Sequence, residues 1–273
     1  MIVNPCAKIN LGLNVVRKRE DGYHDLETVF YPVNILDTID INVSKGKQEH
    51  NCELSIKGIE IEGDMQQNLV VKAYKMLAER YALPDVHVEL TKAIPTQAGM
   101  GGGSSDCAYM IRALNDLFSL DMNIHEMQLL AAKLGADCAF FINPVPSYAE
   151  GIGERLAPID VDLSNYHLAI VKPPVPVSTK EAFSKVTPIQ PEKCCKDIVL
   201  QPIDTWKDEL VNDFEQSVIP LHPEIGEIKD KLYDMGAIYA AMSGSGSALF
   251  GIFKDKPENL DNIFKGYYTA IAK

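Results

Sequence analysis

Several features that would assign a chain to a specialised class are scarce or missing from these 273 residues. No apolar run approaches the ~18 residues that a membrane-spanning helix needs, and nothing at the N-terminus resembles a signal peptide. The six cysteines form no C-x-x-C pair, although Cys194 and Cys195 are adjacent. We therefore expect small buried thiols in a reducing cytoplasm, with the adjacent pair either redox-active or incidental.

Positive charge is also scarce, because 26 Lys and Arg residues face 38 Asp and Glu residues, a net charge of −12. Such a balance argues against nucleic acid as a partner, since phosphate backbones require basic faces. It does not argue against a single nucleotide, which needs only local complementarity. A hydrophobic content of 46% describes an ordinary globular protein, long enough for one large domain or two ordinary ones.

What the chain does contain is a glycine-rich segment, residues 94–105, reading I-P-T-Q-A-G-M-G-G-G-S-S. Apolar residues at helical spacing follow it, so the segment predicts a loop that enters a helix N-terminus near Ser104. First-turn N–H groups lack intrahelical partners, and glycines let the backbone approach a phosphate closely. No Lys ends the loop as in a P-loop, and no dinucleotide-binding G-x-G-x-x-G unit surrounds it. A flexible surface loop is the ordinary alternative, and the Ser-Ser helix start argues against it.

These residues carry a resemblance. The pattern from Pro95 to Asp106 resembles the second motif of the GHMP kinases, a superfamily of small-molecule kinases. Its Ser-Ser-Asp ending is most similar to the branch that phosphorylates 4-diphosphocytidyl-2-C-methyl-D-erythritol. The resemblance implies an ATP-binding segment made of Pro95, Thr96, Gln97, Ala98, Gly99, Met100, Gly101, Gly102, Gly103, Ser104 and Ser105.

Two further segments resemble catalytic motifs of the same family. Residues 6–16 alternate like a strand, which places Lys8 and Asn10 on one face, where an isolated lysine would ordinarily be solvated. The A-K-I-N-L pattern is similar to the first family motif, which implies that Lys8 assists the acceptor hydroxyl and that Asn10 binds substrate. Asp137 heads the apolar run 138–142, at a strand mouth or partly buried, with an N-cap or a satisfied buried carboxylate as alternatives. The resemblance makes Asp137 the candidate general base, although Cys138-Ala139 replaces the usual hydrophobic-Pro pair. A contact between Lys8 and Asp137 is a further hypothesis, since it would keep the carboxylate ionised.

Other motifs resemble the substrate side of that branch. Asp-Gly-Tyr-His, ending at His24, implies a cytidine pocket formed by Tyr23 and His24, where a hairpin turn is the ordinary alternative. The K-P-P segment implies substrate contacts from Thr179 and Phe183, although Phe183 alone would be interpreted as a core residue. The third family motif, which also reads as a hairpin turn, implies contacts from the residues Gly244 and Ser245.

Two more residues are assigned to the nucleotide. Asn68 precedes a helical pattern, where capping would explain it, and the family places a matching Asn beside the adenine. Lys92, just ahead of the glycine loop, is the other candidate. ATP chemistry implies Mg²⁺, with phosphates, waters and Ser105 as its ligands.

The ordered motifs imply an α/β (α+β), two-domain GHMP kinase fold. We expect a ribosomal S5 domain 2-like domain over residues 1–160 and a ferredoxin-like domain over 161–273, with polar loops at 45–51 and 187–205. The implied partners are ATP and a small-molecule substrate, with neither nucleic acid nor membrane. Three alternatives remain open: a GHMP kinase for homoserine or mevalonate, a non-catalytic ligand sensor, and a plain nucleotide-binding module.

Overall fold

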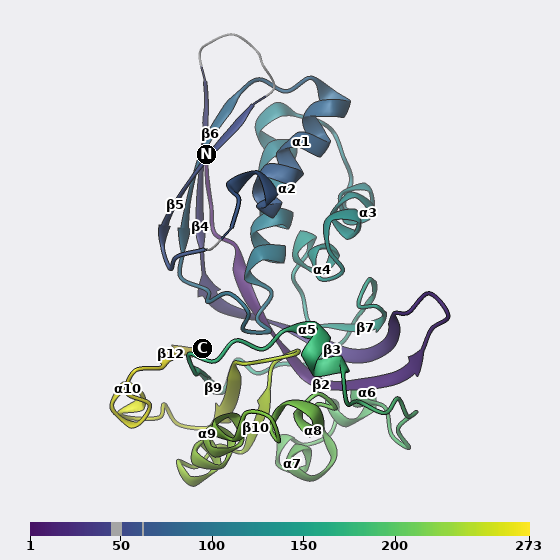
Figure 1. The fold of residues 1–273 in the computed structure, drawn as a ribbon, viewed down its shortest axis with the longest axis vertical. Coiled ribbons are helices and arrows are strands. Elements are labelled where there is room, and N and C mark those ends of the chain that lie inside the picture. Colours follow the sequence, from purple (N-terminus) through teal and green to yellow (C-terminus); the bar gives the residue numbers. More distant parts are fainter. Residues whose placement is uncertain (45–50, 62) are drawn as a thin grey trace. The chain divides into compact units, whose positions relative to one another are not determined.

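The computed structural model describes residues 1–44, 51–61 and 63–273 (Figure 1). The predicted polar loop at 45–51 lies almost wholly outside the described residues. The chain forms two compact units, each assembled from separate stretches. Unit 1 comprises residues 1–7, 35–96 and 101–144, and unit 2 comprises residues 8–34, 97–100 and 145–273. The predicted domain boundary at residue 160 concerns family domains and stays a prediction.

Unit 1 is a four-stranded sheet with helices gathered on one face (Figure 1). The strand order is β1-β4-β6-β5, and only β5 and β6 pair in parallel. A parallel pair needs a crossover connection, which the helix α1 supplies. The elements are β1 (Ile2–Val3), β4 (Thr38–Val43), β5 (Cys52–Gly58), η1 (Met65–Gln67), α1 (Leu69–Tyr81), β6 (Val86–Lys92), α2 (Gly102–Phe118), α3 (Ile124–Leu134) and α4 (Cys138–Ile142).

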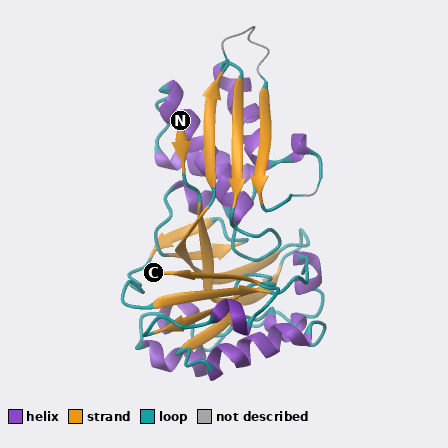
Figure 2. Ribbon diagram, turned by 90° about the vertical axis from the view of Figure 1, so that its left-hand side faces the viewer, coloured by secondary structure: helices purple, strands orange, loops and turns teal. Residues whose placement is uncertain are grey.

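Unit 2 contains two four-stranded sheets (Figure 2). One sheet has the order β2-β3-β7-β8 and is formed by β2 (Cys6–Lys18), β3 (His24–Leu36), β7 (Ser147–Gly151) and β8 (Arg155–Pro158). The other has the antiparallel order β10-β11-β9-β12 and is formed by β9 (His167–Lys172), β10 (Tyr239–Met242), β11 (Leu249–Phe253) and β12 (Tyr268–Ala272).

Helices pack against the β10-β11-β9-β12 sheet and complete its hydrophobic core. The helix α9 packs on β10 and β11, and its buried face joins residues from both strands in one apolar cluster. The helical elements are α5 (Thr179–Phe183), α6 (Cys195–Ile198), η2 (Ile203–Thr205), α7 (Trp206–Glu209), α8 (Glu215–Val218), α9 (Pro223–Asp234) and α10 (Leu260–Ile263). No helix in the described part of the chain is both long and apolar enough to span a membrane.

Two local predictions were wrong. Residues 138–142 form the helix α4 rather than a strand, because a five-residue apolar run is compatible with either structure once all of it is buried. The segment 187–205 is not simply a loop, since α6 and η2 form within it. Five of the six cysteines are buried, Cys194 is partly exposed, and all six are free thiols.

Candidate active site

Lys8 and Asn10 lie side by side on β2 in unit 2, as their alternation predicts. Both are buried, and Lys8 Nζ donates a hydrogen bond of 2.5 Å to Asn10 Oδ1. The same ammonium lies 5.0 Å from the ring centroid of Phe30. Asn10 Nδ2 in turn donates to Thr28 Oγ1 at 2.9 Å. The sequence identified the lysine and the asparagine. Thr28 lies in the L-x-T-V-F pattern that follows His24, but it was assigned no role in the site.

The glycine loop is divided between the two units, with residues 97–100 belonging to unit 2. There the turn between β10 and β11 holds it: Ser243 Oγ donates to the Gly99 carbonyl at 2.9 Å, and Ala248 N donates to the Ala98 carbonyl at 3.3 Å. Gly99 has φ +70°, and a Cβ there would lie 1.8 Å from the Ser243 carbonyl oxygen. Only glycine fits this position. Gly244 belongs to the same turn, where it is buried, and Ser245 is partly exposed.

The rest of the loop, residues 101–105, forms the N-terminus of α2 in unit 1. Gly101 is the N-cap residue, in the left-handed region, and Ser105 N donates to its carbonyl at 2.8 Å. Gly103 is exposed and Ser104 partly exposed. The Ser105 hydroxyl is fully buried and has no hydrogen-bond partner. A buried hydroxyl without a partner is costly, so a ligand that supplied one would be favoured here.

Lys92 ends β6 in unit 1, with its ammonium buried between two carboxylates. Its Nζ donates to Asp106 Oδ2 at 2.7 Å and to Asp37 Oδ2. Asp37 also accepts from the backbone N–H groups of Ala93 (2.6 Å) and Ile94 (2.9 Å), at the start of the loop. Burial raises the pKa of Asp106 to about 7, although the Lys92 charge opposes this shift. Lys92 as an ATP-binding residue stays a prediction, and Asp37 carries no sequence signal that would have identified it.

The remaining nucleotide and catalytic candidates of unit 1 lie at helix starts. Asn68 is the N-cap of α1, with its Oδ1 accepting from Val70 N at 2.9 Å. Asp137 occupies the N-cap position of α4, and its side chain makes no capping hydrogen bond. Because Lys8 belongs to unit 2 and Asp137 to unit 1, their predicted contact stays a prediction.

The candidate cytidine pocket lies within unit 2. His24 stacks on Phe183, with ring centroids 4.6 Å apart and planes 17° apart, and Phe183 meets Phe214 edge-on. Partial burial lowers the pKa of His24, and the Lys18 charge lowers it further. Thr179, the first residue of α5, is exposed. The structure thus brings together two of the predicted aromatic residues.

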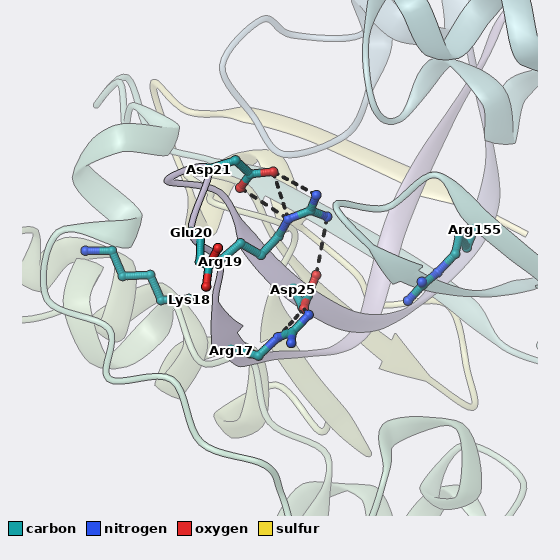
Figure 3. Close-up of a pocket in the computed structure, with 7 residues that line it drawn as sticks. All are labelled: Arg17, Lys18, Arg19, Glu20, Asp21, Asp25 and Arg155. Carbon is teal, nitrogen blue, oxygen red and sulfur yellow. Dashed lines mark hydrogen bonds and ion pairs between the residues drawn. The ribbon is translucent and has the colours of Figure 1, made fainter.

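Charged residues brace the β2–β3 turn that presents Tyr23, which is 61% exposed. Arg17 pairs with Asp25 at 2.5 Å, and Arg19 pairs with Asp21 at 2.7 Å. Asp21 also accepts from Tyr23 N at 3.1 Å. These groups line an open cleft of about 720 Å³ (Figure 3). Because the carboxylates of Asp21 and Asp25 bind groups within the turn itself, their main effect is to stabilise the conformation of its backbone.

Two family models match this chain. The model of the GHMP kinases N terminal domain matches residues 68–144, and the GHMP kinases C terminal model matches residues 196–267. The first covers the glycine loop and Asp137, and the second covers the turn that holds Gly99. The glycine loop and the turn that holds it therefore both lie within matched family domains, whereas Lys8, His24 and Phe183 lie outside the two matched ranges.

Relatives match over nearly the whole chain. The 4-diphosphocytidyl-2-C-methyl-D-erythritol kinase of Parabacteroides distasonis is 49% identical, covering 94% of this chain and 93% of the relative. That of Cytophaga hutchinsonii is 44% identical over 100% and 99%. A crystal structure of 4-(cytidine 5'-diphospho)-2C-methyl-D-erythritol kinase superposes with a TM-score of 0.81 at 29% identity, covering 100% and 99%. A homoserine kinase from Cytophaga hutchinsonii, 18% identical with a TM-score of 0.71 over 100% and 94%, shares the fold. By these matches the chain belongs to the 4-diphosphocytidyl-2-C-methyl-D-erythritol kinase family of the GHMP kinases.

Proposed function

We propose that this protein transfers the γ-phosphoryl group of ATP to the 2-hydroxyl of 4-diphosphocytidyl-2-C-methyl-D-erythritol, in the cytoplasm, as a step of the non-mevalonate isoprenoid precursor pathway. The observation that carries the proposal is that relatives of this name match at 49% identity over more than nine-tenths of the chain, not at the phosphate loop alone. The homoserine and mevalonate kinases share only the fold, at 13–18% identity.

Phosphoryl transfer asks a protein mainly for positioning and charge stabilisation. In this proposal the loop from Pro95 to Ser105 holds the triphosphate, with backbone amides at the α2 N-terminus facing the anion. Asn68 lies beside the adenine, and Lys92, at the end of β6 just before the loop, contributes to the ATP site. The unpartnered Ser105 hydroxyl supports this assignment, because it is a buried donor in the predicted segment.

Lys8 and Asp137 have complementary roles at the acceptor. The ammonium of Lys8 stabilises negative charge that develops at the hydroxyl, with Asn10 holding the substrate beside it. Asp137 orients the hydroxyl and accepts its proton. An alcohol is a very weak acid, so its proton leaves late, and a carboxylate hydrogen-bonded to it suffices.

The substrate's base is recognised by Tyr23, His24 and Phe183, since an aromatic can stack a base and an imidazole can bond its edge. Thr179 lies on the same helix as Phe183. Gly244 and Ser245 border the substrate's phosphate region. The observed His24–Phe183 stack supports an aromatic pocket in unit 2.

Mg²⁺ is part of the proposal, and its fit can be judged from the donors present. Among the described residues, no group of three or more His, Cys, Asp or Glu side chains could hold a metal. Kinases usually bind Mg²⁺ through phosphates and waters with few protein ligands, so this donor set is compatible with it. Ser105 is the side chain that would contact it. When bound, Mg²⁺ neutralises charge on the phosphates.

The test is ATP turnover with the cytidyl substrate beside homoserine and mevalonate, for wild type, Asp137→Ala and the exposed control Asp162→Ala. We expect turnover of the cytidyl substrate alone, and a fall of about 10²–10⁴-fold in kcat for Asp137→Ala only. Turnover of homoserine or mevalonate would identify another GHMP kinase. ATP binding without product would indicate a sensor or a binding module. Full activity of Asp137→Ala would still support the proposed reaction, but it would show that Asp137 is not the general base.

A further inference from the structure

Thr28 lies in β3 of unit 2 and is 1% exposed. Its hydroxyl makes two hydrogen bonds: Oγ1 lies 2.5 Å from the Gly12 carbonyl oxygen and 2.9 Å from Asn10 Nδ2. Asn10 Oδ1 then lies 2.5 Å from Lys8 Nζ. A single line of contacts thus runs from the β2 backbone through two side chains to the candidate catalytic ammonium.

The direction of every hydrogen bond in this line is determined by chemistry. A carbonyl oxygen can only accept a hydrogen bond, so Thr28 must donate its one hydroxyl hydrogen to the Gly12 carbonyl. Thr28 can then only accept from Asn10, and the amide nitrogen is the group that can donate. The amide oxygen is left facing Lys8, whose ammonium only donates. A reversed Asn10 amide would place its N–H groups against the Lys8 ammonium and its oxygen against Thr28 Oγ1, whose hydrogen is already donated to Gly12.

The start of this line is itself fixed. Gly12 has φ +70°, and a Cβ there would lie 2.6 Å from Leu210 Cδ1, so a side chain is not accommodated at this position. Its neighbour Leu13 donates its N–H to the Val211 carbonyl at 2.9 Å. The Gly12 carbonyl is therefore a rigid reference for Thr28.

We propose that Thr28 is a positioning residue, which fixes the orientation of the Asn10 amide and thereby holds the Lys8 ammonium in place for phosphoryl transfer. This inference rests on the proposed role of Lys8. Thr28 does not touch the substrate in this account. Its contribution passes through Asn10, so its loss should affect the chemical step and not the binding of ATP.

The variants are Thr28→Val, which keeps the shape and removes the hydroxyl, and Thr28→Ser, which keeps the hydroxyl. Thr28→Val should lower kcat about 10- to 100-fold, because a hydrogen bond to a charged group is misdirected, with the KM for ATP within about twofold of wild type. Thr28→Ser should keep kcat within about threefold. Tyr74→Phe is the matched control, since it deletes a buried hydroxyl that donates to the Pro84 carbonyl at 2.8 Å, away from these contacts. It should lose stability but not kcat.

If Thr28→Val does not fold, Thr28→Cys takes its place in the test. Cys differs from Ser by one atom, but its thiol is only a weak hydrogen-bond donor. Cys matching Ser in kcat, or Val within about threefold of wild type, would overturn the proposal. The side-chain NH₂ signals of Asn10 in NMR spectra give a readout that needs no turnover. They should shift in Thr28→Val and not in Thr28→Ser, and unshifted signals in Val would also overturn it. Wild type that makes no phosphorylated cytidyl product would instead count against the proposed function.

Discussion

The Asp106 carboxylate provides a stability experiment with a defined sign. It is buried in unit 1 beside a second carboxylate, Asp37, and both share the one ammonium of Lys92. One oxygen of Asp106 has no hydrogen-bond partner. Burial raises its pKa from 3.8 to about 7 in the folded protein, so the folded state favours the protonated acid more than the unfolded chain does.

The sign follows from proton linkage. Between 3.8 and about 7 the folded state retains a proton that the unfolded chain has released. The free energy of unfolding therefore falls as pH rises through this window and becomes level above it. Each pH unit is worth at most about 1.4 kcal/mol, so the Asp106 contribution should fall on the order of 2–3 kcal/mol between about pH 5 and pH 8.

The perturbation is Asp106→Asn, measured by urea unfolding at several pH values beside wild type. Asn does not titrate, so the difference between the two curves reports Asp106 together with the two groups that it interacts with, Asp37 and Lys92, and cancels the groups elsewhere in the protein. Its amide nitrogen adds a cost independent of pH, which moves the curve without changing its slope. We expect the free energy of unfolding of the variant to increase relative to that of wild type as pH rises. Parallel curves, or a variant that loses ground with rising pH, would refute the reasoning.

Substitutions at the buried ion pair, at the glycine loop and at two helix N-caps should also have measurable effects. Lys92→Met should cost about 3–5 kcal/mol at about pH 8 in urea unfolding, and less at about pH 5, because it strands two buried carboxylates; adding Asp106→Asn should recover part of the loss. Gly99→Ala should cost at least about 2 kcal/mol and abolish turnover, through its positive φ and the Ser243 carbonyl, and a variant with wild-type kcat would contradict this. Asn123 is the N-cap of α3, where its Oδ1 accepts from Glu126 N at 3.0 Å, as Asn68 is of α1. Asn68→Ala and Asn123→Ala should each lower the free energy of unfolding by about 1 kcal/mol, while only Asn68→Ala raises the KM for ATP.

Strongly patterned parts of the fold were predictable from sequence. The alternation of residues 6–16 corresponds to β2, and the helix expected to start near Ser104 is α2, which begins at Gly102. The run 138–142 was not predictable, because burial of all five residues removes the difference between helix and strand periods. Asp37 was missed for another reason. Its partners lie 55 to 57 residues further along the chain, and no local pattern reports such a contact.

Motif residues and supporting residues therefore differ in how they can be found. In the proposed function, glycines in the loop allow close approach to phosphate, but each also loses more backbone entropy on ordering than other residues do. In unit 1 the start of the loop is ordered by Asp37, which binds the N–H groups of residues 93 and 94. In unit 2 Ser243 binds the Gly99 carbonyl. Thr28 plays the corresponding part for Lys8. If preorganisation is what these residues supply, their conservative replacements should be tolerated where the hydrogen bond survives, and should lower kcat where it does not.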